Sequence, residues 1–169
     1  MSEIINVLIA FNADDIIKDY PNPSQKSSDP TPIDEADKYV YMMVKTKNVY
    51  SGQTGAKLDI SAEVGDLIRW RETTYSFDSE YSVLLYQYEG DSKLLSKPEP
   101  TSTEANLPFP TPTPQDSAHF DPQTVTGHYW YANVKASGEG NYHFYFQLID
   151  KKGKPVGYFT WDPYLHIEK

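Results

Sequence analysis

The stretch at 56–71, AKLDISAEVGDLIRWR, contains the clearest structural pattern of this 169-residue chain. Apolar residues occupy every second position of its first half, namely Ala56, Leu58, Ile60, Ala62 and Val64. Because the side chains of a β-strand alternate between two faces, this spacing predicts a strand with one buried face and one wet face. Gly65 and Asp66 mark a turn, after which the run beginning at Leu67 predicts a returning strand.

Further strands are predicted on both sides of this stretch. The segments 81–88, 128–135 and 141–149 are rich in aromatic and apolar residues, and the last two show the same alternation. The run Ile4–Phe11 is almost continuously apolar, which predicts a strand buried on both faces. About eight or nine strands at this spacing predict an all-β protein, an antiparallel β-sandwich or jelly roll. The chain length favours a single domain over residues 1–169.

Residues 97–122 contain seven of the thirteen prolines of the chain. Proline cannot donate to a sheet ladder and favours extended polyproline conformation, so this segment is expected to lie outside the sheets. Two arrangements stay open for it. It forms either a disordered insert or a strap that packs over the sandwich through Leu107, Phe109 and Phe120.

Composition argues against several classes of protein. The chain has a formal net charge of −9, a pI of about 4.8 and a mean hydropathy of −0.62, so nucleic acid and anionic membranes are expected to be repelled. The absence of cysteine removes disulfides, thiolate metal sites and cysteine nucleophiles. No basic n-region or cleavage signal is visible before the first strand, so we expect no secretory signal, and no apolar run approaches the roughly 20 residues of a membrane span. We therefore expect a cytoplasmic protein, although release without a signal peptide would leave no mark in the sequence.

No catalytic motif is recognisable. The four histidines form neither H-x-H nor H-E-x-x-H, and the chain contains no G-x-S-x-G elbow or phosphate-binding loop. The 24 acidic residues leave a pair of glycosidase carboxylates open, because so many acids form pairs by chance. We expect a protein that is not an enzyme.

Carboxylates beside predicted strand ends are candidate cation ligands. Asp14 follows the first strand, and Asp162 lies between the last two strand segments. Loops at one end of a sandwich can gather such oxygen ligands for calcium. The alternative is structural: Asn12 would cap a short helix, and Asp162 would form a turn before Pro163. Calcium at Asp14 and Asp162 is therefore one of two open interpretations.

Two proline-stiffened loops combine aromatic rings with polar side chains, as sugar-binding sites do. The sequence YPNPSQ offers Asn22, Ser24 and Gln25 for sugar hydroxyls. The sequence WDPY offers Trp161 for stacking and Asp162 as a hydroxyl or cation ligand. A rigid loop loses little entropy on binding, which favours this interpretation. The alternative is that Trp161 belongs to the core and the prolines only prevent edge pairing.

The chain resembles the AidA/PixA family of bacterial inclusion-body proteins through the segments INVLIAFNADDII, DYPNPSQ, NVYSGQTGAKLDISAEVGDLIRW, YSVLLYQY, HYWYANV and YHFYFQLIDKKGKPVGYFTWDPYLHI. The resemblance spans nearly the whole chain except 97–122. It implies a compact β-sandwich that accumulates to high levels in the cytoplasm, with expression tied to cell density or host association. The closing pattern of a Gly- and Asp-bearing turn before a final aromatic strand is also similar to small bacterial lectins of jelly-roll type.

Two functions from different classes follow. The first is a small soluble lectin that binds a glycan or monosaccharide, with calcium as its candidate cofactor. The second is a storage or inclusion-body protein that self-assembles and has no small-molecule site. Either is expected to form homo-oligomers, because linking weak sites raises avidity. Saturable binding that free sugar competes away would distinguish the lectin from the self-assembling protein.

Overall fold

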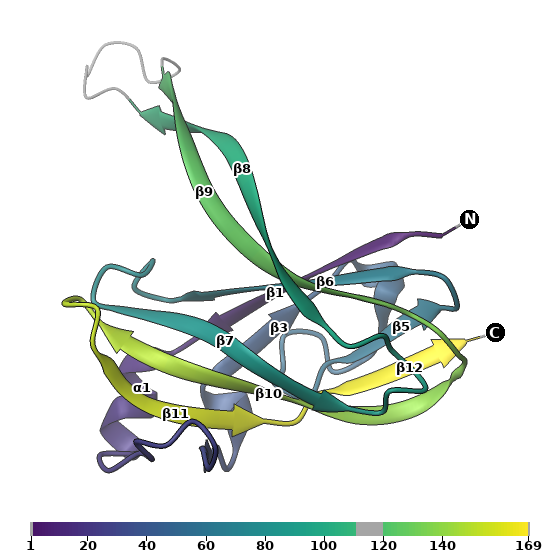
Figure 1. Cartoon of the computed structure of the whole chain (residues 1–169), viewed down its shortest axis with the longest axis horizontal. Helices are drawn as coiled ribbons and strands as arrows, with labels where there is room; N and C mark the ends of the chain where they lie inside the picture. Colours follow the sequence, from purple (N-terminus) through teal and green to yellow (C-terminus); the bar gives the residue numbers. More distant parts are fainter. Residues whose placement is uncertain (1, 111–119, 169) are drawn as a thin grey trace.

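The structure is a computed structural model that describes residues 2–110 and 120–168. Two β-sheets pack face to face as a sandwich, and one pair of strands projects from it (Figure 1). The first sheet has the order β3-β1-β6-β9-β8 and consists of β1 (Ile4–Phe11), β3 (Val40–Met43), β6 (Leu67–Thr74), β8 (Glu99–Pro110) and β9 (Phe120–Asn133). The second has the order β2-β11-β10-β12-β5-β4, with β7 also paired to β10. Its strands are β2 (Thr31–Pro32), β4 (Val49–Ser51), β5 (Asp59–Glu63), β7 (Tyr81–Gly90), β10 (Gly138–Asp150), β11 (Pro155–Trp161) and β12 (Tyr164–Glu168).

Short helices occupy some of the connections. These are α1 (Ala13–Asp19) and the 3-10 helices η1 (Ala36–Lys38) and η2 (Thr46–Asn48). The Asn12 side chain accepts a hydrogen bond from the Asp15 N–H at 3.4 Å, so the structural alternative of a helix cap at Asn12 is confirmed. In the part of the chain that the structure describes, no helix is long and apolar enough to cross a membrane.

The β-sandwich predicted from the sequence is confirmed, but its sheets are mixed rather than purely antiparallel. Parallel pairs join β1 to β6, β12 to β5 and β11 to β2. One cause of these parallel pairs is that β5 and β6 follow each other in the chain but belong to different sheets. The turn at Gly65 and Asp66 therefore carries the chain from one sheet to the other. The Asp66 carboxylate holds this turn by accepting hydrogen bonds from the N–H groups of Glu3 (2.7 Å) and Glu63 (2.9 Å).

Aromatic side chains fill the space between the sheets. The alternate residues of β10 are at most 1% exposed, as their spacing predicts: Tyr142, Phe144, Phe146 and Leu148. The Phe144 ring lies 5.4 Å from the Trp70 ring of the first sheet and 5.9 Å from the Trp161 ring of the second, measured between ring centroids. Burial of each such side chain contributes roughly 1.5–3 kcal/mol. This aromatic layer therefore holds the two sheets together.

One expectation for β1 holds only at the end of the strand. Its apolar run predicts burial on both faces, but residues 4–9 alternate between exposed and buried, and only the last three residues of the strand are buried in succession. Ile5 and Ile9 are at most 1% exposed, whereas Ile4 and Leu8 are 44% and 41% exposed. Their exposure shows that no described segment covers this part of the outer face of the first sheet. Among the described residues, the outer face of β1 is therefore open at Ile4 and Leu8, whereas Ala10 on the same face is 7% exposed.

The proline-rich segment also differs from the expectation, because much of it forms strand. β8 and β9 pair antiparallel, with Pro108 directly opposite Pro122. Opposite residues of an antiparallel pair exchange both hydrogen bonds or neither, and two prolines can exchange neither. The sheet tolerates Pro108 because β8 is its last strand, so that the missing N–H faces away from the ladder. Residues 111–119 lie outside the described part of the chain.

The projecting pair of strands is not a strap over the sandwich. Leu107 and Phe109 are 48% and 56% exposed, and the side chain of Phe120 lies outside what the structure describes. β6 pairs with β9 only between Trp130 and Asn133, so beyond this point the described residues of β8 and β9 pair only with each other. We call residues 101–109 and 121–129 the arm, and Figure 1 shows it rising away from the sandwich.

Candidate functional site

The loop that contains Asn22, Ser24 and Gln25 is fastened to β11 by hydrogen bonds. The Ser24 carbonyl accepts from the Tyr158 N–H at 3.0 Å, and the Gln25 side-chain amide donates to the Val156 carbonyl at 2.9 Å. The Ser24 hydroxyl donates to the Lys26 carbonyl at 3.3 Å, whereas Asn22 is exposed. The side chains of Ser24 and Gln25 therefore serve the loop itself, and their role in sugar binding stays a prediction.

This loop packs closely on the segment GYFTWDPY. Pro23 lies directly on Gly157 of β11, where an added Cβ atom would lie only 2.4 Å from the proline ring. Only glycine leaves room for that contact. The family-like motifs at 20–25 and 157–164 are therefore two halves of one packing arrangement.

Trp161 is a core side chain. Its exposed fraction is 2%, and its ring centroid lies 5.3 Å from that of Phe11 and 5.5 Å from that of Phe146. The alternation along β11 places this ring on the inner face together with Phe159. A sugar could stack on Trp161 only if the ring left the core. The expected stacking role is corrected accordingly, and the core alternative is the one observed.

The two predicted cation ligands lie in different elements. Asp14 is exposed in the first turn of α1, and Asp162 lies half-buried between β11 and β12. Residues 2–110 and 120–168 contain no group of three or more His, Asp or Glu side chains placed as metal ligands. Calcium binding at Asp14 and Asp162 stays a prediction that this geometry does not support.

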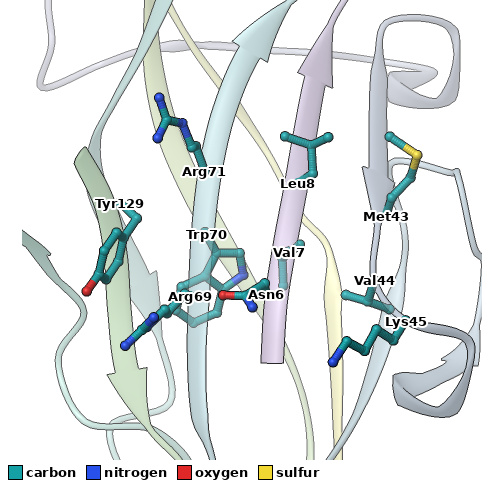
Figure 2. A pocket seen from close by; sticks show the side chains of 10 residues that line it. All are labelled: Asn6, Val7, Leu8, Met43, Val44, Lys45, Arg69, Trp70, Arg71 and Tyr129. Carbon is teal, nitrogen blue, oxygen red and sulfur yellow. The ribbon is translucent and has the colours of Figure 1, made fainter. Parts of the chain in front are cut away.

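A shallow groove of about 510 Å³ crosses the outer face of the first sheet (Figure 2). We call it the cationic groove. Its lining residues are Asn6, Val7, Leu8, Met43, Val44, Lys45, Arg69, Trp70, Arg71 and Tyr129. Figure 2 shows Arg69 and Arg71 along β6, with Leu8 and Met43 on the neighbouring strands. Apolar side chains and cationic side chains thus share one exposed surface.

The charge of this groove contrasts with that of the whole chain. Arg69 and Arg71 are the only two arginines of the sequence, and with Lys45 they give the groove three cations and no acidic lining residue. The Arg69 guanidinium lies 4.8 Å from the centroid of the Tyr129 ring, a cation–π contact. Arg71 reaches the base of the arm, because a Cβ atom added at Gly127 would lie 3.0 Å from its guanidinium nitrogens. The groove is suited to an apolar segment that carries carboxylates.

A second depression, of about 740 Å³, lies along β7 and β10. We call it the acidic cleft, and its lining residues are Glu89, Gly90, Asp91, Glu139, Gly140, Asn141, His143, Tyr145 and Thr160. The Tyr145 hydroxyl donates to the Glu89 carboxylate at 2.6 Å, and this hydrogen bond raises the pKa of Tyr145. None of the residues predicted from the sequence to bind sugar lines this cleft. Its carboxylates, amide and imidazole are nevertheless groups that can bind hydroxyls.

A buried carboxylate joins the base of the arm to the sandwich. Glu72 of β6 is 7% exposed, and its Oε1 accepts a hydrogen bond from the Leu85 N–H of β7 at 3.1 Å. The same oxygen lies 2.7 Å from Nε2 of His128, which belongs to the arm. Because β6 and β7 belong to different sheets, Glu72 links both sheets and the arm. We assign it a structural role.

The cationic groove is not evident in the sequence, because its residues come from separate strands that only the fold brings together. One signal was available. The two arginines are spaced two residues apart, at 69 and 71, on the side of a predicted strand opposite to Trp70. That spacing places both on one face of a strand.

The fold and these surfaces define a class: a β-sandwich protein with an open cationic face and a projecting arm. A family model described as PixA, inclusion body protein, matches residues 3–167. The chain therefore belongs to the PixA family of inclusion body proteins, as the resemblance in its sequence implies.

Solved structures support the fold. The crystal structure of the inclusion body protein PixA from Burkholderia cenocepacia J2315 superimposes with a TM-score of 0.82 at 18% identity and covers 99% of this chain and 97% of that one. Amebosin (TM-score 0.28, 11% identity, 73% of this chain and 93% of that one) and a cysteine protease inhibitor from Entamoeba histolytica (0.30, 14%, 64% and 84%) match too weakly to carry an argument. A search of curated protein sequences finds no significant match.

Proposed function

We propose that the protein is a self-associating protein that accumulates in cytoplasmic inclusions, and that the cationic groove is a contact surface between copies. Membership of the inclusion body protein family supports an assembling role. The observation that carries the proposal is the open outer face of the first sheet, where Leu8 and Met43 are 41% and 37% exposed beside Arg69 and Arg71. The proposal requires no catalytic activity, metal, nucleic acid or membrane.

Charge explains why this face suits contacts between identical copies. A chain with a net charge of −9 repels its own copies at long range, which keeps them apart while they are dilute. Three cations gathered on one apolar face offset this repulsion locally, because they can meet acidic surface on a neighbouring copy. Exposed apolar side chains then gain from leaving water. The same face thus attracts an acidic surface of a neighbouring copy and buries apolar side chains against it.

The test is light scattering of the purified protein over a range of concentrations. We expect the mean mass to rise above the 19.3 kDa of one chain with concentration, and to fall back at about 1 M salt, where charges are screened beyond roughly 3 Å. The double variant Arg69→Glu with Arg71→Glu should need at least about tenfold more protein to associate, since like charges that meet cost several kcal/mol. The control is Lys152→Glu with Lys154→Glu, the same change of charge in an exposed turn. A wild-type protein of constant monomeric mass would contradict the proposal.

Carbohydrate binding is the second candidate function. The support for it is the acidic cleft, which places Glu89, Asn141 and His143 around one open depression beside Tyr145. The sequence-based candidates Asn22, Ser24 and Gln25 lie in a different place, on the loop fastened to β11. A sugar would therefore bind in the cleft, at the loop, or at neither. Single substitutions in each place distinguish these three cases.

A glycan array run with calcium and again with a chelator tests this candidate. We expect binding that is lost in Asn141→Ala and kept in Asn22→Ala if the cleft holds the sugar. The reverse pattern would favour the loop. Binding lost in chelator would bring calcium back as a cofactor, whereas a blank array with folded protein would leave self-association as the proposed function.

A further inference from the structure

We propose that the arm of one copy docks into the cationic groove of a second copy. The inference rests on the proposed self-association and names the two surfaces that make the contact. The arm is a two-stranded ribbon formed by residues 101–109 and 121–129, and the groove lies on the outer face of the first sheet.

The first argument is that, among the described residues, the arm beyond its base pairs only with itself. An isolated pair of strands is marginally stable in water, and a third strand or a packed face is usually needed to hold it. Residues 104–109 of the arm are all exposed. Exposed strand edges and apolar strand faces are surfaces that proteins normally cover. A second copy of the chain would supply that cover.

The second argument is that the arm has two different faces. Ala105 lies opposite Val125, Leu107 is two residues further along the same face, and Phe109 follows after another two. The other face carries Glu104, Asn106 and Thr124, and the Thr124 hydroxyl donates to the Asn106 side chain at 2.8 Å. A ribbon with one apolar and one polar face is built to bury the apolar one.

The third argument is charge complementarity. The described residues of the arm contain Glu104 and Asp121 and no lysine or arginine. Asp121 pairs directly with Phe109, so a carboxylate sits beside the most exposed apolar side chain of the arm. The groove presents the matching pattern, with Arg69 and Arg71 beside Leu8. The apolar face of the arm carries one carboxylate, Asp121, whereas Glu104 lies on the opposite face, and this face therefore meets a cationic, apolar groove.

Geometry points to a second copy rather than to the same chain. The arm rises from the sheet away from the sandwich, and its Leu107 and Phe109 side chains stay 48% and 56% exposed (Figure 1). The exposed Leu107 and Phe109 of the arm and the groove are different surfaces of one molecule, although Tyr129 at the base of the arm also lines the groove. A contact between different surfaces is heterologous and leaves each bound copy with a free arm or a free groove for a further copy.

Complementary variants test the contact. Leu107→Asp with Phe109→Asp disables the arm and leaves the groove intact. Arg69→Glu with Arg71→Glu disables the groove and leaves Leu107 and Phe109 of the arm unchanged, although both arginines contact the base of the arm at Tyr129 and Gly127. We expect each variant alone to need at least about tenfold more protein than wild type to associate. An equimolar mixture should form a 1:1 complex in sedimentation velocity, because one working arm meets one working groove. Circular dichroism confirms that both variants are folded.

Three results would overturn the inference. If wild type associates and the arm variant associates equally well, then the arm is not the contact, although the proposed function stands. If the mixture stays monomeric while wild type associates, then arm and groove do not meet. A wild type that does not associate at all would overturn both the inference and the proposed function.

A cross-link gives a second measurement that does not depend on weakening the contact. The chain has no cysteine, so any disulfide must come from introduced ones. Phe109→Cys on one copy and Leu8→Cys on another should yield a covalent dimer under mild oxidation. The matched control pairs Phe109→Cys with Lys152→Cys, which lies in the turn between β10 and β11. Equal cross-linking in both mixtures would contradict the inference.

Discussion

The two faces of the first sheet are made by the same strands but differ in what covers them. On β1, Ile9 is fully buried against the second sheet, whereas the adjacent Leu8 is 41% exposed on the outer face. On β6, Trp70 is buried in the aromatic layer, while Arg69 and Arg71 point into the groove on the other side. Apolar side chains in a strand therefore mark a surface that can be buried, and the molecule that buries them can be another copy of the chain.

The largest expected effect on stability is the difference between two neighbouring positions of β1, one on each face of the first sheet. Ile9→Ala should lower the free energy of unfolding by about 2–5 kcal/mol, because it leaves a cavity between the sheets. Leu8→Ala, at the adjacent position, should change it by no more than about 0.5 kcal/mol, as exposed positions do. Urea denaturation of dilute protein measures both. Equal losses would mean that the outer face is already covered within one copy.

The second-largest expected effect on the free energy of unfolding is at Glu72, the carboxylate buried between the sheets. Glu72→Ala should cost about 1–3 kcal/mol, because the Leu85 N–H would lose its buried hydrogen-bond partner. Glu72→Gln keeps an acceptor of the same shape and is expected to recover part of that loss. Urea denaturation compares the two variants. A neutral Glu72→Ala would show that water replaces the carboxylate and that the sheets do not depend on this link.

The third effect tests the contrast with the second sheet, whose β11 is covered by a loop of its own chain. Gly157→Ala should destabilise the protein by about 1–3 kcal/mol, because the new methyl group would overlap Pro23. Gly153→Ala is the control for added volume, since nothing lies within 4 Å of a Cβ atom there, although its φ of +75° adds backbone strain. If Gly157→Ala proves the milder of the two in thermal unfolding, the close packing of this loop would be refuted.

The smallest expected effect on stability is at the rim of the groove. Lys45→Glu should leave the unfolding free energy within about 0.5 kcal/mol, because the side chain is exposed. It should nevertheless weaken association and reduce its dependence on salt, since one cation of the groove is lost. Light scattering at two salt concentrations measures this. If Lys45→Glu associates as wild type does, then only the two arginines of the groove contribute to the contact.

Where the sequence alternates, local patterns predicted the buried face of a strand well. The alternation in 141–149 and in 56–62 identified core residues correctly, because burial on one face leaves a two-residue period in the sequence. The helix cap at Asn12 was also foreseen as one alternative, since capping depends on neighbours only. Val64 is an exception, being 48% exposed, because the strand ends just before it.

Properties that depend on distant parts of the chain could not be predicted. The crossing from β5 to β6 between sheets, and hence the parallel pairs, follows from the whole topology and not from the turn residues. The prolines of β8 fit a strand only because that strand lies at an edge. Trp161 looked like an exposed sugar platform in its loop context, yet the register of β11 turns it inward.

Hydroxyl-radical footprinting of the wild-type protein, dilute and then associated, tests most directly whether the outer face joins copies. Met43, Leu107 and Phe109 are exposed in a single copy and should lose labelling on association, whereas Tyr164, 39% exposed on the second sheet, should keep it. Loss at Met43 together with loss at the two arm residues would support the contact between groove and arm. Associated protein in which Met43 stays fully labelled would contradict it.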